Sequence, residues 1–338
     1  MSDVLSQATP LPGAVPEVFG QGAFRYEVLP EWVRLPEGWS LREVAGIGVD
    51  ARDNVYVFNR GEHPVIVFDR AGNVLRSWGE GVFRHAHGLH MAPDATIYLT
   101  DDGDHTVRRY TLEGRLLSTL GTPGVATAFM CGDPFCRPTH TALAPSGELY
   151  VSDGYGNARI HKYDPDGRYL FSWGGSGIGP GEFTIPHNIV CDEDGWVYVA
   201  DRESHRVQVF DGYGRYETEW NHLHRPAALF MPPNSPVCFV GELGPLPANT
   251  RYHNLGPRIS VVGKNGRLLS RIGGMTAGHG PADFIGPHGI AADTKGDVYV
   301  GEVSRTFWSF FWPDIPVPAE VRCLRKLRRV PVPECDWS

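Results

Sequence analysis

Residues 186–220 read PHNIVCDEDGWVYVADRESHRVQVFDGYGRYETEW, and this stretch contains four short runs rich in Val, Ile, Tyr and Phe. Turns rich in Asp, Gly and Ser separate the runs, which predicts four β-strands. Similar phrases recur along the chain at residues 43–79, 86–121, 138–174, 225–273 and 287–311. One four-stranded unit cannot bury its faces alone. Six units at a period of roughly 40 residues therefore predict an all-β, six-bladed β-propeller with a central channel.

The two ends of the sequence are expected to complete this organisation. The sixth repeat is short, with three expected strands before Trp312, so segment 24–29 is expected to supply the missing outer strand and close the ring. This division gives an N-terminal extension over 1–40, the propeller over 41–312 and a basic, Pro-rich tail over 313–338. The tail is expected to lie across the propeller surface as a strap, with an oligomer contact as the alternative.

The composition argues against several other classes of protein. The chain contains 41 Gly and 28 Pro among 338 residues, which disfavours long helices. Its net charge is −8, and no run of like charge is long enough to form a polyanion-binding patch, which argues against nucleic acid as a partner. No apolar run approaches the roughly 18 residues of a membrane span, and the N-terminus lacks the features of a secretory signal. Six scattered cysteines without a signal are expected to be free thiols, so we expect a cytoplasmic protein.

Histidines recur at the start of the expected innermost strands. Aligning the repeats places one residue of each blade at the same position, namely Ala45, His87, His140, His187, Ala227 and His288. Imidazoles that converge on the channel suit a borderline divalent metal, and three of them leave a coordination position open, as in catalytic zinc sites. His85 is a further candidate ligand because it lies two residues before His87. The alternative is a polar, water-filled channel whose histidines bond to one another and to solvent.

The turns that follow the second strands are expected to face one mouth of this channel. Most of them carry an acidic residue, which we expect to cap the turn and pair with nearby backbone. Arg60 and Arg202 depart from this pattern, and two arginines near a metal can hold a substrate carboxylate through paired N–H groups. Tyr155 lies between Gly154 and Gly156. Positive charge from arginine and a metal favours its phenolate, so Tyr155 is a candidate base.

With these residues identified, the chain resembles peptidyl-α-hydroxyglycine α-amidating lyase, a six-bladed propeller enzyme of the NHL-repeat group, over roughly residues 43–310. The motifs that carry the resemblance occur in the family's order, at residues 59–63 (NRGEH), 87–89 (HGL), 152–160 (SDGYGNARI), 186–187 (PH), 200–203 (ADRE) and 287–288 (PH).

The resemblance implies a chemistry as well as a fold. It implies zinc, held by His87, His187 and His288, acting as a Lewis acid on the hydroxyl of a carbinolamide. It also implies that Tyr155 takes the hydroxyl proton, and that two arginines, Arg60 and Arg202, orient the substrate carboxylate and stabilise the phenolate. Cleavage of the C–N bond then gives an amide and glyoxylate without water, which is a lyase reaction.

Four positions depart from the family pattern. Gly289 replaces an acidic residue after the third zinc histidine, which makes a structural calcium ion doubtful. Gly286 replaces a bulky apolar residue, so the pocket differs. His140 replaces an acidic residue, and it is a candidate fourth ligand, neighbour of the ligands or acid–base group. Cys136 matches a family disulfide cysteine whose partner position is Gly156, which agrees with a reducing compartment.

The sequence therefore predicts a metal-dependent lyase acting on a small carbinolamide or hemiaminal-type α-hydroxy substrate that carries a carboxylate. A metal-dependent hydrolase or hydratase at the same site is one alternative, and a non-catalytic NHL-type propeller that binds a protein is another. Secreted peptide hormones are not expected as substrates, because the sequence shows neither a signal nor a hydroxylating companion domain. Three histidines also suit iron, manganese, cobalt or copper. The substrate and the oligomeric state stay open.

Overall fold

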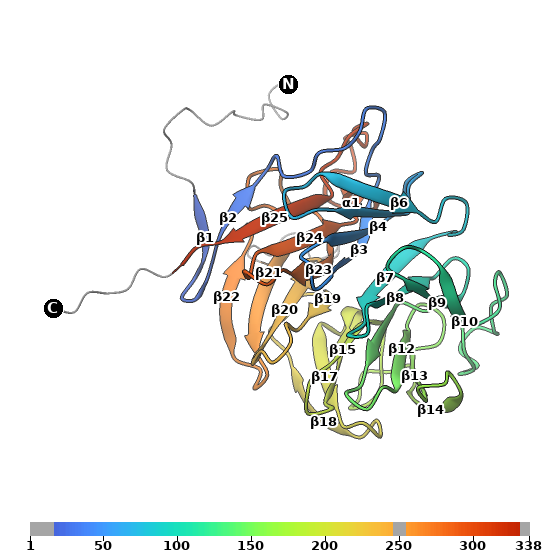
Figure 1. Cartoon of the computed structure of the whole chain (residues 1–338). Coiled ribbons are helices and arrows are strands. Elements are labelled where there is room, and N and C mark those ends of the chain that lie inside the picture. Colours follow the sequence, from blue (N-terminus) through green and yellow to red (C-terminus); the bar gives the residue numbers. More distant parts are fainter. Residues whose placement is uncertain (1–16, 246–254, 332–338) are drawn as a thin grey trace.

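The computed structural model describes residues 17–245 and 255–331, and within these ranges the strands form six antiparallel sheets around a common centre (Figure 1). The six-bladed β-propeller predicted from the repeats is confirmed. Blades 1 to 5 each consist of four consecutive strands.

The strands of these five blades follow the chain from the channel outward. They are β3 (Val44–Val49), β4 (Val55–Asn59), β5 (Val65–Phe68) and β6 (Val74–Trp78) in blade 1; β7 (Ala86–Met91), β8 (Thr96–Asp101), β9 (Thr106–Thr111) and β10 (Leu116–Leu120) in blade 2; β11 (His140–Leu143), β12 (Leu149–Asp153), β13 (Arg159–Tyr163) and β14 (Tyr169–Gly174) in blade 3; β15 (Pro186–Cys191), β16 (Val197–Asp201), β17 (Arg206–Phe210) and β18 (Tyr216–Trp220) in blade 4; and β19 (Pro226–Phe230), β20 (Val237–Glu242), β21 (Arg258–Gly263) and β22 (Leu268–Ile272) in blade 5.

Blade 6 joins segments from the two ends of the described chain. Its strand order is β23 (Pro287–Ala292), β24 (Val298–Glu302), β25 (Leu324–Arg329), β2 (Phe24–Leu29) and β1 (Val18–Gln21). Figure 1 shows the blue N-terminal strands beside the red strand β25. The N-terminal segment thus forms the outer part of the last blade, and antiparallel pairing of β2 with β25 closes the ring.

The C-terminal part of blade 6 differs from the sequence prediction. The sequence predicts a surface strap over 313–338, of which 332–338 lie outside the described residues. Within the described part, β25 is instead the third strand of the blade and pairs with β24. The basic residues of β25 explain this placement, because Arg325 pairs with Glu302 and Lys326 pairs with Asp297. Pairing of this kind lets charged side chains sit inside a blade.

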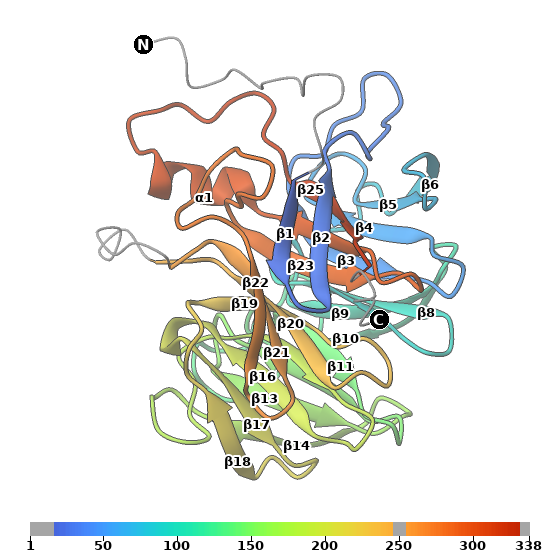
Figure 2. The same cartoon turned by 90° about the vertical axis from the view of Figure 1, so that its left-hand side faces the viewer.

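The stretch expected as that third strand is instead a helix, α1 (Ser304–Phe311). Phe307 and Trp308 are buried while Phe310 is exposed, a spacing that fits one face of a helix better than strict alternation. Figure 2 shows α1 beside the sheets rather than within one. Within residues 17–245 and 255–331, no helix is both long and apolar enough to cross a membrane.

Most of the core lies between neighbouring blades. Phe58 and Val65 of blade 1, for example, belong to one buried cluster with Leu89 and Ile97 of blade 2. Second strands such as β12 are fully buried, whereas an outer strand such as β14 contains no buried residue. This gradient explains why the second strands are rich in Val and Tyr on both faces. It also leaves the inner strands rigidly held around the channel.

A polar residue at the end of each second strand holds the segment of chain that leads into the innermost strand of the same blade. The carboxylates accept backbone N–H groups, as Asp101 does from Arg84 at 2.7 Å and Glu302 does from Ile285 at 2.7 Å. The side-chain oxygen of Asn59 plays the same part in blade 1. The turn-capping role expected for these repeated residues is confirmed. Their hydrogen bonds fix the position of the first residue of each innermost strand along the channel.

The innermost strands of blades 1, 2, 4, 5 and 6 each carry a β-bulge next to their first residue, where the register against the second strand shifts. A bulge leaves one residue unpaired and turns its side chain out of the ladder. The unpaired residues are Ala45, His87, His187, Ala227 and His288.

Candidate active site

Three of the bulge residues, His87, His187 and His288, converge in the channel. They come from β7, β15 and β23, which belong to blades 2, 4 and 6. One ring nitrogen from each lies within 4.8 Å of the other two, and none of the three residues is more than 5% exposed. The structure therefore brings together the three residues predicted as metal ligands. They are called the ligand histidines below.

The ligand histidines share one hydrogen-bond pattern. Each Nδ1 lies 2.7 Å from a backbone carbonyl oxygen in the following blade, which belongs to Thr139 for His87, to Ala227 for His187 and to Ala45 for His288. Because a carbonyl only accepts hydrogen bonds, Nδ1 carries the proton and the lone pair of Nε2 is available to a metal.

The electrostatics favour the neutral form of these imidazoles. Burial, followed by the charges of neighbouring arginines and imidazoles, lowers the pKa of His87 and His187 well below the ordinary value and that of His288 to about 3. Neutral imidazole is the form that binds a metal. Three buried nitrogen donors with an open fourth position fit a divalent cation such as zinc.

His140 does not join the ligand histidines, and the prediction that it shares their repeat position is wrong. In blade 3, His140 pairs with Ser152, the register position that Asn188 has opposite Ala200 in blade 4. The counterpart of the ligand histidines in blade 3 is therefore Thr139, one residue earlier.

The surroundings of His140 also exclude a ligand role in this arrangement. Its Nδ1 lies 2.9 Å from the carbonyl oxygen of Thr141, and its Nε2 lies 3.1 Å from that of Leu89. A carbonyl oxygen lies next to each nitrogen, so a metal would have to displace one of them to reach the lone pair of the neutral ring. Burial, together with the nearby His90, lowers the pKa of His140 to about 4.

Tyr155 follows β12, and its hydroxyl meets the ligand histidines. The phenol oxygen lies 3.0 Å from Nε2 of both His87 and His187. Arg202, in the short 3-10 helix η1 (Arg202–Ser204), donates from Nη1 to the same oxygen at 3.3 Å. Its Nε donates to Glu203 at 2.8 Å, which holds the guanidinium in place. Arg202 therefore presents a fixed positive charge to the Tyr155 oxygen.

Arg60 borders the ligand histidines from blade 1. Its Nε donates to the carbonyl oxygen of Ala86 at 2.9 Å, and its Nη1 pairs with Glu43 at 3.0 Å. Ala86 directly precedes His87, so both predicted arginines lie beside the metal-binding nitrogens. A cavity of about 320 Å³ opens next to Arg60, and Arg84 and His85 line its other side.

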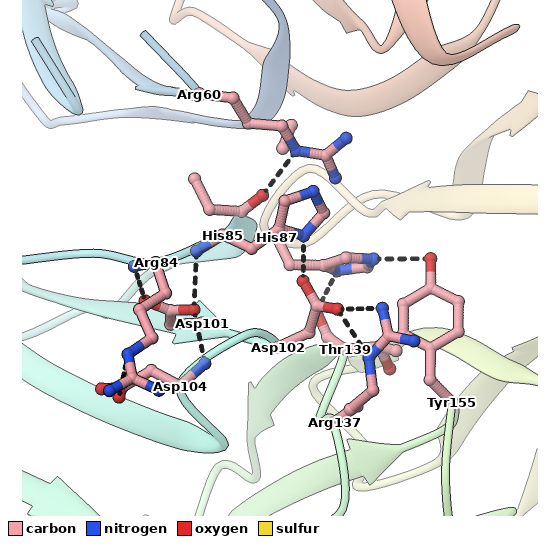
Figure 3. A network of polar contacts seen from close by, with 12 residues as sticks. Arg60, Arg84, His85, His87, Asp101, Asp102, Asp104, Arg137, Thr139 and Tyr155 are labelled. Carbon is pink, nitrogen blue, oxygen red and sulfur yellow. Dashed lines mark hydrogen bonds and ion pairs between the residues drawn. The ribbon is translucent and has the colours of Figure 1, made fainter. Parts of the chain in front are cut away.

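The sequence analysis missed a second polar group at this mouth, shown in Figure 3. Asp102 accepts from Arg137 Nε at 3.1 Å and Nη2 at 2.6 Å, and its other oxygen is hydrogen-bonded to His85. His85 is thus the partner of Asp102 and lies outside the group of ligand histidines. One signal was available: Asp101 is the repeated turn residue, so Asp102 directly after it is an additional acid.

Three of the positions that depart from the family pattern have visible consequences. Gly289 offers no side-chain oxygen to a cation, and a Cβ there would lie 2.9 Å from the backbone nitrogen of Ile47. Beside Gly286, the ring of Phe307 occupies the space that a larger side chain would enter. Cys136 is a free thiol whose sulfur lies 2.2 Å from where a Cβ at position 156 would be.

Comparisons with known proteins agree with the fold and with part of the site. The model of the NHL repeat matches residues 135–163 and 183–210. NHL repeat-containing protein 3 of Homo sapiens is 32% identical over 291 residues, which cover 80% of each chain. Peptidyl-glycine alpha-amidating monooxygenase B of Xenopus laevis is 30% identical over 346 residues, 89% of this chain and 38% of that protein.

A third relative carries the name of the lyase itself. Peptidyl-alpha-hydroxyglycine alpha-amidating lyase 1 of Drosophila melanogaster is 29% identical over 250 residues, 69% of this chain and 45% of that protein. This chain thus spans less than half the length of both amidating relatives but most of the human NHL protein. The chain belongs to the NHL-repeat family of six-bladed β-propellers and, within it, resembles peptidyl-α-hydroxyglycine α-amidating lyase.

Proposed function

We propose that this protein is a metal-dependent lyase that cleaves the C–N bond of a small carbinolamide or hemiaminal-type substrate carrying a carboxylate. The observation that carries the proposal is the position of the Tyr155 oxygen, 3.0 Å from two ligand-histidine nitrogens and 3.3 Å from Arg202. A base, a metal position and an arginine at one point are the parts that deprotonation of a hydroxyl requires. The names of the amidating relatives support the same reaction class.

The ligand histidines would hold the metal through Nε2, where a bound divalent cation supplies positive charge that stabilises an alkoxide. We propose zinc, with another divalent cation as the alternative. Arg60 and Arg202 flank the site from two blades and bind the substrate carboxylate through their guanidinium N–H groups. This contact directs the hydroxyl of the substrate toward Tyr155.

The proposed steps balance without water. Tyr155, as a phenolate, accepts the proton of the substrate hydroxyl. The electron pair of that O–H bond forms the new C=O bond, and the pair of the C–N bond leaves with the amide nitrogen. Tyr155 then returns its proton to this nitrogen. The products are an amide and an aldehyde, which is glyoxylate when the substrate is an α-hydroxyglycine derivative.

The proposal extends to the partners and the cellular location of the protein. We propose a small carboxylated molecule as the substrate, no nucleic acid or membrane as a partner, and a cytoplasmic location. The five cysteines of the described ranges are free thiols, which supports a reducing compartment.

The test is glyoxylate release from N-acyl-α-hydroxyglycines by wild type and by Tyr155→Phe. General-base catalysis predicts that this substitution lowers kcat by about 100-fold or more, with bound metal and melting temperature unchanged. Tyr213→Phe is the matched control, because that side chain is exposed in the turn between β17 and β18. Wild type that releases no glyoxylate would refute the reaction. A Tyr155→Phe variant with full turnover would refute the role of Tyr155.

A further inference from the structure

The starting point is the carboxylate of Asp102, which is fully buried at the mouth of the channel and yet ionised. Burial opposes its ionisation, but the hydrogen bonds and charges of His85 and Arg137 outweigh burial and lower the pKa of Asp102. The carboxylate binds Arg137 through both Nε and Nη2, which fixes the plane of the guanidinium. Asp102 therefore serves to orient a side chain that is itself 49% exposed.

Arg137 is held over the ring of Tyr155. Its guanidinium carbon lies 4.7 Å from the centre of that ring. The close-up in Figure 3 shows the two side chains next to each other. Its backbone has φ +63°, in the left-handed region that non-glycine residues seldom adopt, and such residues concentrate at functional sites. The remaining nitrogen, Nη1, has no hydrogen-bond partner among the described residues. A fixed, half-exposed donor thus stands beside the base.

The arginines of the site divide into two sets by their contacts. Arg202 bonds the Tyr155 oxygen, and Arg60 bonds the backbone next to His87, so both lie on the side where the hydroxyl and the carboxylate of the substrate would bind. Arg202 also lies over the Tyr155 ring, at 5.5 Å, but Arg137 lies closer, at 4.7 Å, and makes no bond to the Tyr155 oxygen. Nη1 of Arg137 is therefore free to donate to another group of the substrate.

The proposed reaction leaves one charge without a partner. When the C–N bond breaks, its electron pair moves to the amide nitrogen and, by resonance, to the oxygen of the acyl carbonyl. That oxygen carries most of the negative charge until the nitrogen is protonated. A positioned guanidinium N–H is the kind of donor that stabilises such an oxyanion.

Resting on the function proposed above, we infer that Arg137, oriented by Asp102, is a catalytic residue that donates a hydrogen bond from Nη1 to the acyl oxygen of the leaving amide. Among the substrates proposed above, this donor would assist a carbinolamide, whose leaving nitrogen carries an acyl group. A leaving amine without a carbonyl next to it would gain nothing from this donor.

The first experiment measures binding and needs no turnover. N-benzoylglycine has the acyl carbonyl and the carboxylate but no hydroxyl, and 4-phenylbutanoate has the same length and charge without the amide. Calorimetry on the zinc-loaded protein should show that Arg137→Gln lowers the affinity for N-benzoylglycine by about tenfold and leaves the affinity for 4-phenylbutanoate nearly unchanged. Asp102→Asn should have the same selective effect, because it releases the guanidinium. Arg168→Gln is the control, at an arginine whose side chain is 78% exposed in another part of blade 3.

An equal loss of affinity for both ligands, or no change in either affinity, would overturn the inference whatever the catalytic activity is.

The second experiment measures kcat for N-benzoyl-α-hydroxyglycines with para substituents that vary the acidity of the leaving benzamide. Loss of the donor should make log kcat depend more steeply on that acidity in Arg137→Gln than in wild type, with Arg137→Lys between them. A merely structural role would lower every rate by one factor and leave the slope unchanged, which would overturn the catalytic assignment.

The two experiments separate this inference from the proposed function. Selective loss of N-benzoylglycine binding without any glyoxylate release would refute the lyase and the catalytic role together, while the carbonyl-binding site would stand. Glyoxylate release by wild type with an unchanged slope in Arg137→Gln would keep the lyase and remove Arg137 from its mechanism.

Discussion

Even-numbered and odd-numbered blades contribute opposite halves of the histidine group that we propose holds the metal. At the same point of the innermost strand, blades 2, 4 and 6 present an imidazole, and blades 3, 5 and 1 present the carbonyl oxygen that holds it. The residues that supply these carbonyls are Thr139, Ala227 and Ala45. A six-fold fold is thereby turned into a three-fold site. The blades without a ligand are thus as much a part of the site as the blades with one.

The first test of this comparison removes an imidazole from an even-numbered blade. His187→Ala should lower zinc affinity by more than about 100-fold, because losing a ligand exceeds the 10- to 100-fold cost of losing a partner of a ligand. Zinc per protein after dialysis against a weak chelator measures the effect. The control, His140→Ala, should keep its zinc. A His140 variant that loses as much metal as His187→Ala would contradict the division between blades.

The second test concerns His140, the histidine that begins the innermost strand of an odd-numbered blade, blade 3. The pKa of buried His140 is lowered from 6.5 to about 4, so between these values the unfolded chain binds more protons than the folded chain. Stability should therefore fall as pH drops through this window, by about 2 kcal/mol between pH 7 and pH 5 for this group.

His140→Asn should remove that part of the pH dependence, and Asn is the residue that blade 4 carries at the same register position, Asn188. Urea unfolding of the metal-free variant and wild type at the two pH values gives the difference. An identical pH dependence in both proteins would show that the carbonyls around His140 retain its charged form.

The smallest expected effect comes from an odd-numbered blade that carries no ligand. The Thr139 hydroxyl donates to the carbonyl of Pro186 at 2.8 Å and meets the Ser152 hydroxyl at 2.8 Å, which fixes the strand start whose carbonyl holds His87. Thr139→Val should weaken zinc binding by about five- to tenfold, less than loss of a direct partner. Competition with a chromogenic chelator measures it. Unchanged affinity at a lowered melting temperature would mean that the carbonyl keeps its place without the hydroxyl.

The sequence was sufficient for the fold and for the ligand histidines because both repeat. Its error at His140 came from aligning histidine with histidine. Counting from the preceding proline, Pro138 or Pro186, pairs Thr139 with His187 and gives the register that the structure shows. A bulge changes by one position which residue of the innermost strand faces the channel, and the spacing of the strands in the sequence does not reveal this.

The parts that the sequence did not predict depend on contacts between distant, non-repeated segments. Arg137 meets Asp102 across 35 positions, and each lies just outside a strand, where periodic pattern carries no information. Strand β25 is separated from β24 by helix α1 and its following loop, so no local signal marks it as the next strand of the blade. Such pairings follow from packing and charge in three dimensions.

The closure of blade 6 has a consequence for the order in which the protein is made. Glu27 and Arg328 pair across 301 positions, and β25 lies between β24 and β2. While the chain leaves the ribosome, five blades can form one after another, but β24 and β2 both keep an unpaired edge until Arg329 has emerged. Such edges are templates for pairing with other chains. The nascent protein therefore stays exposed to aggregation through these edges until β25 has been made, and completing this one strand ends that exposure.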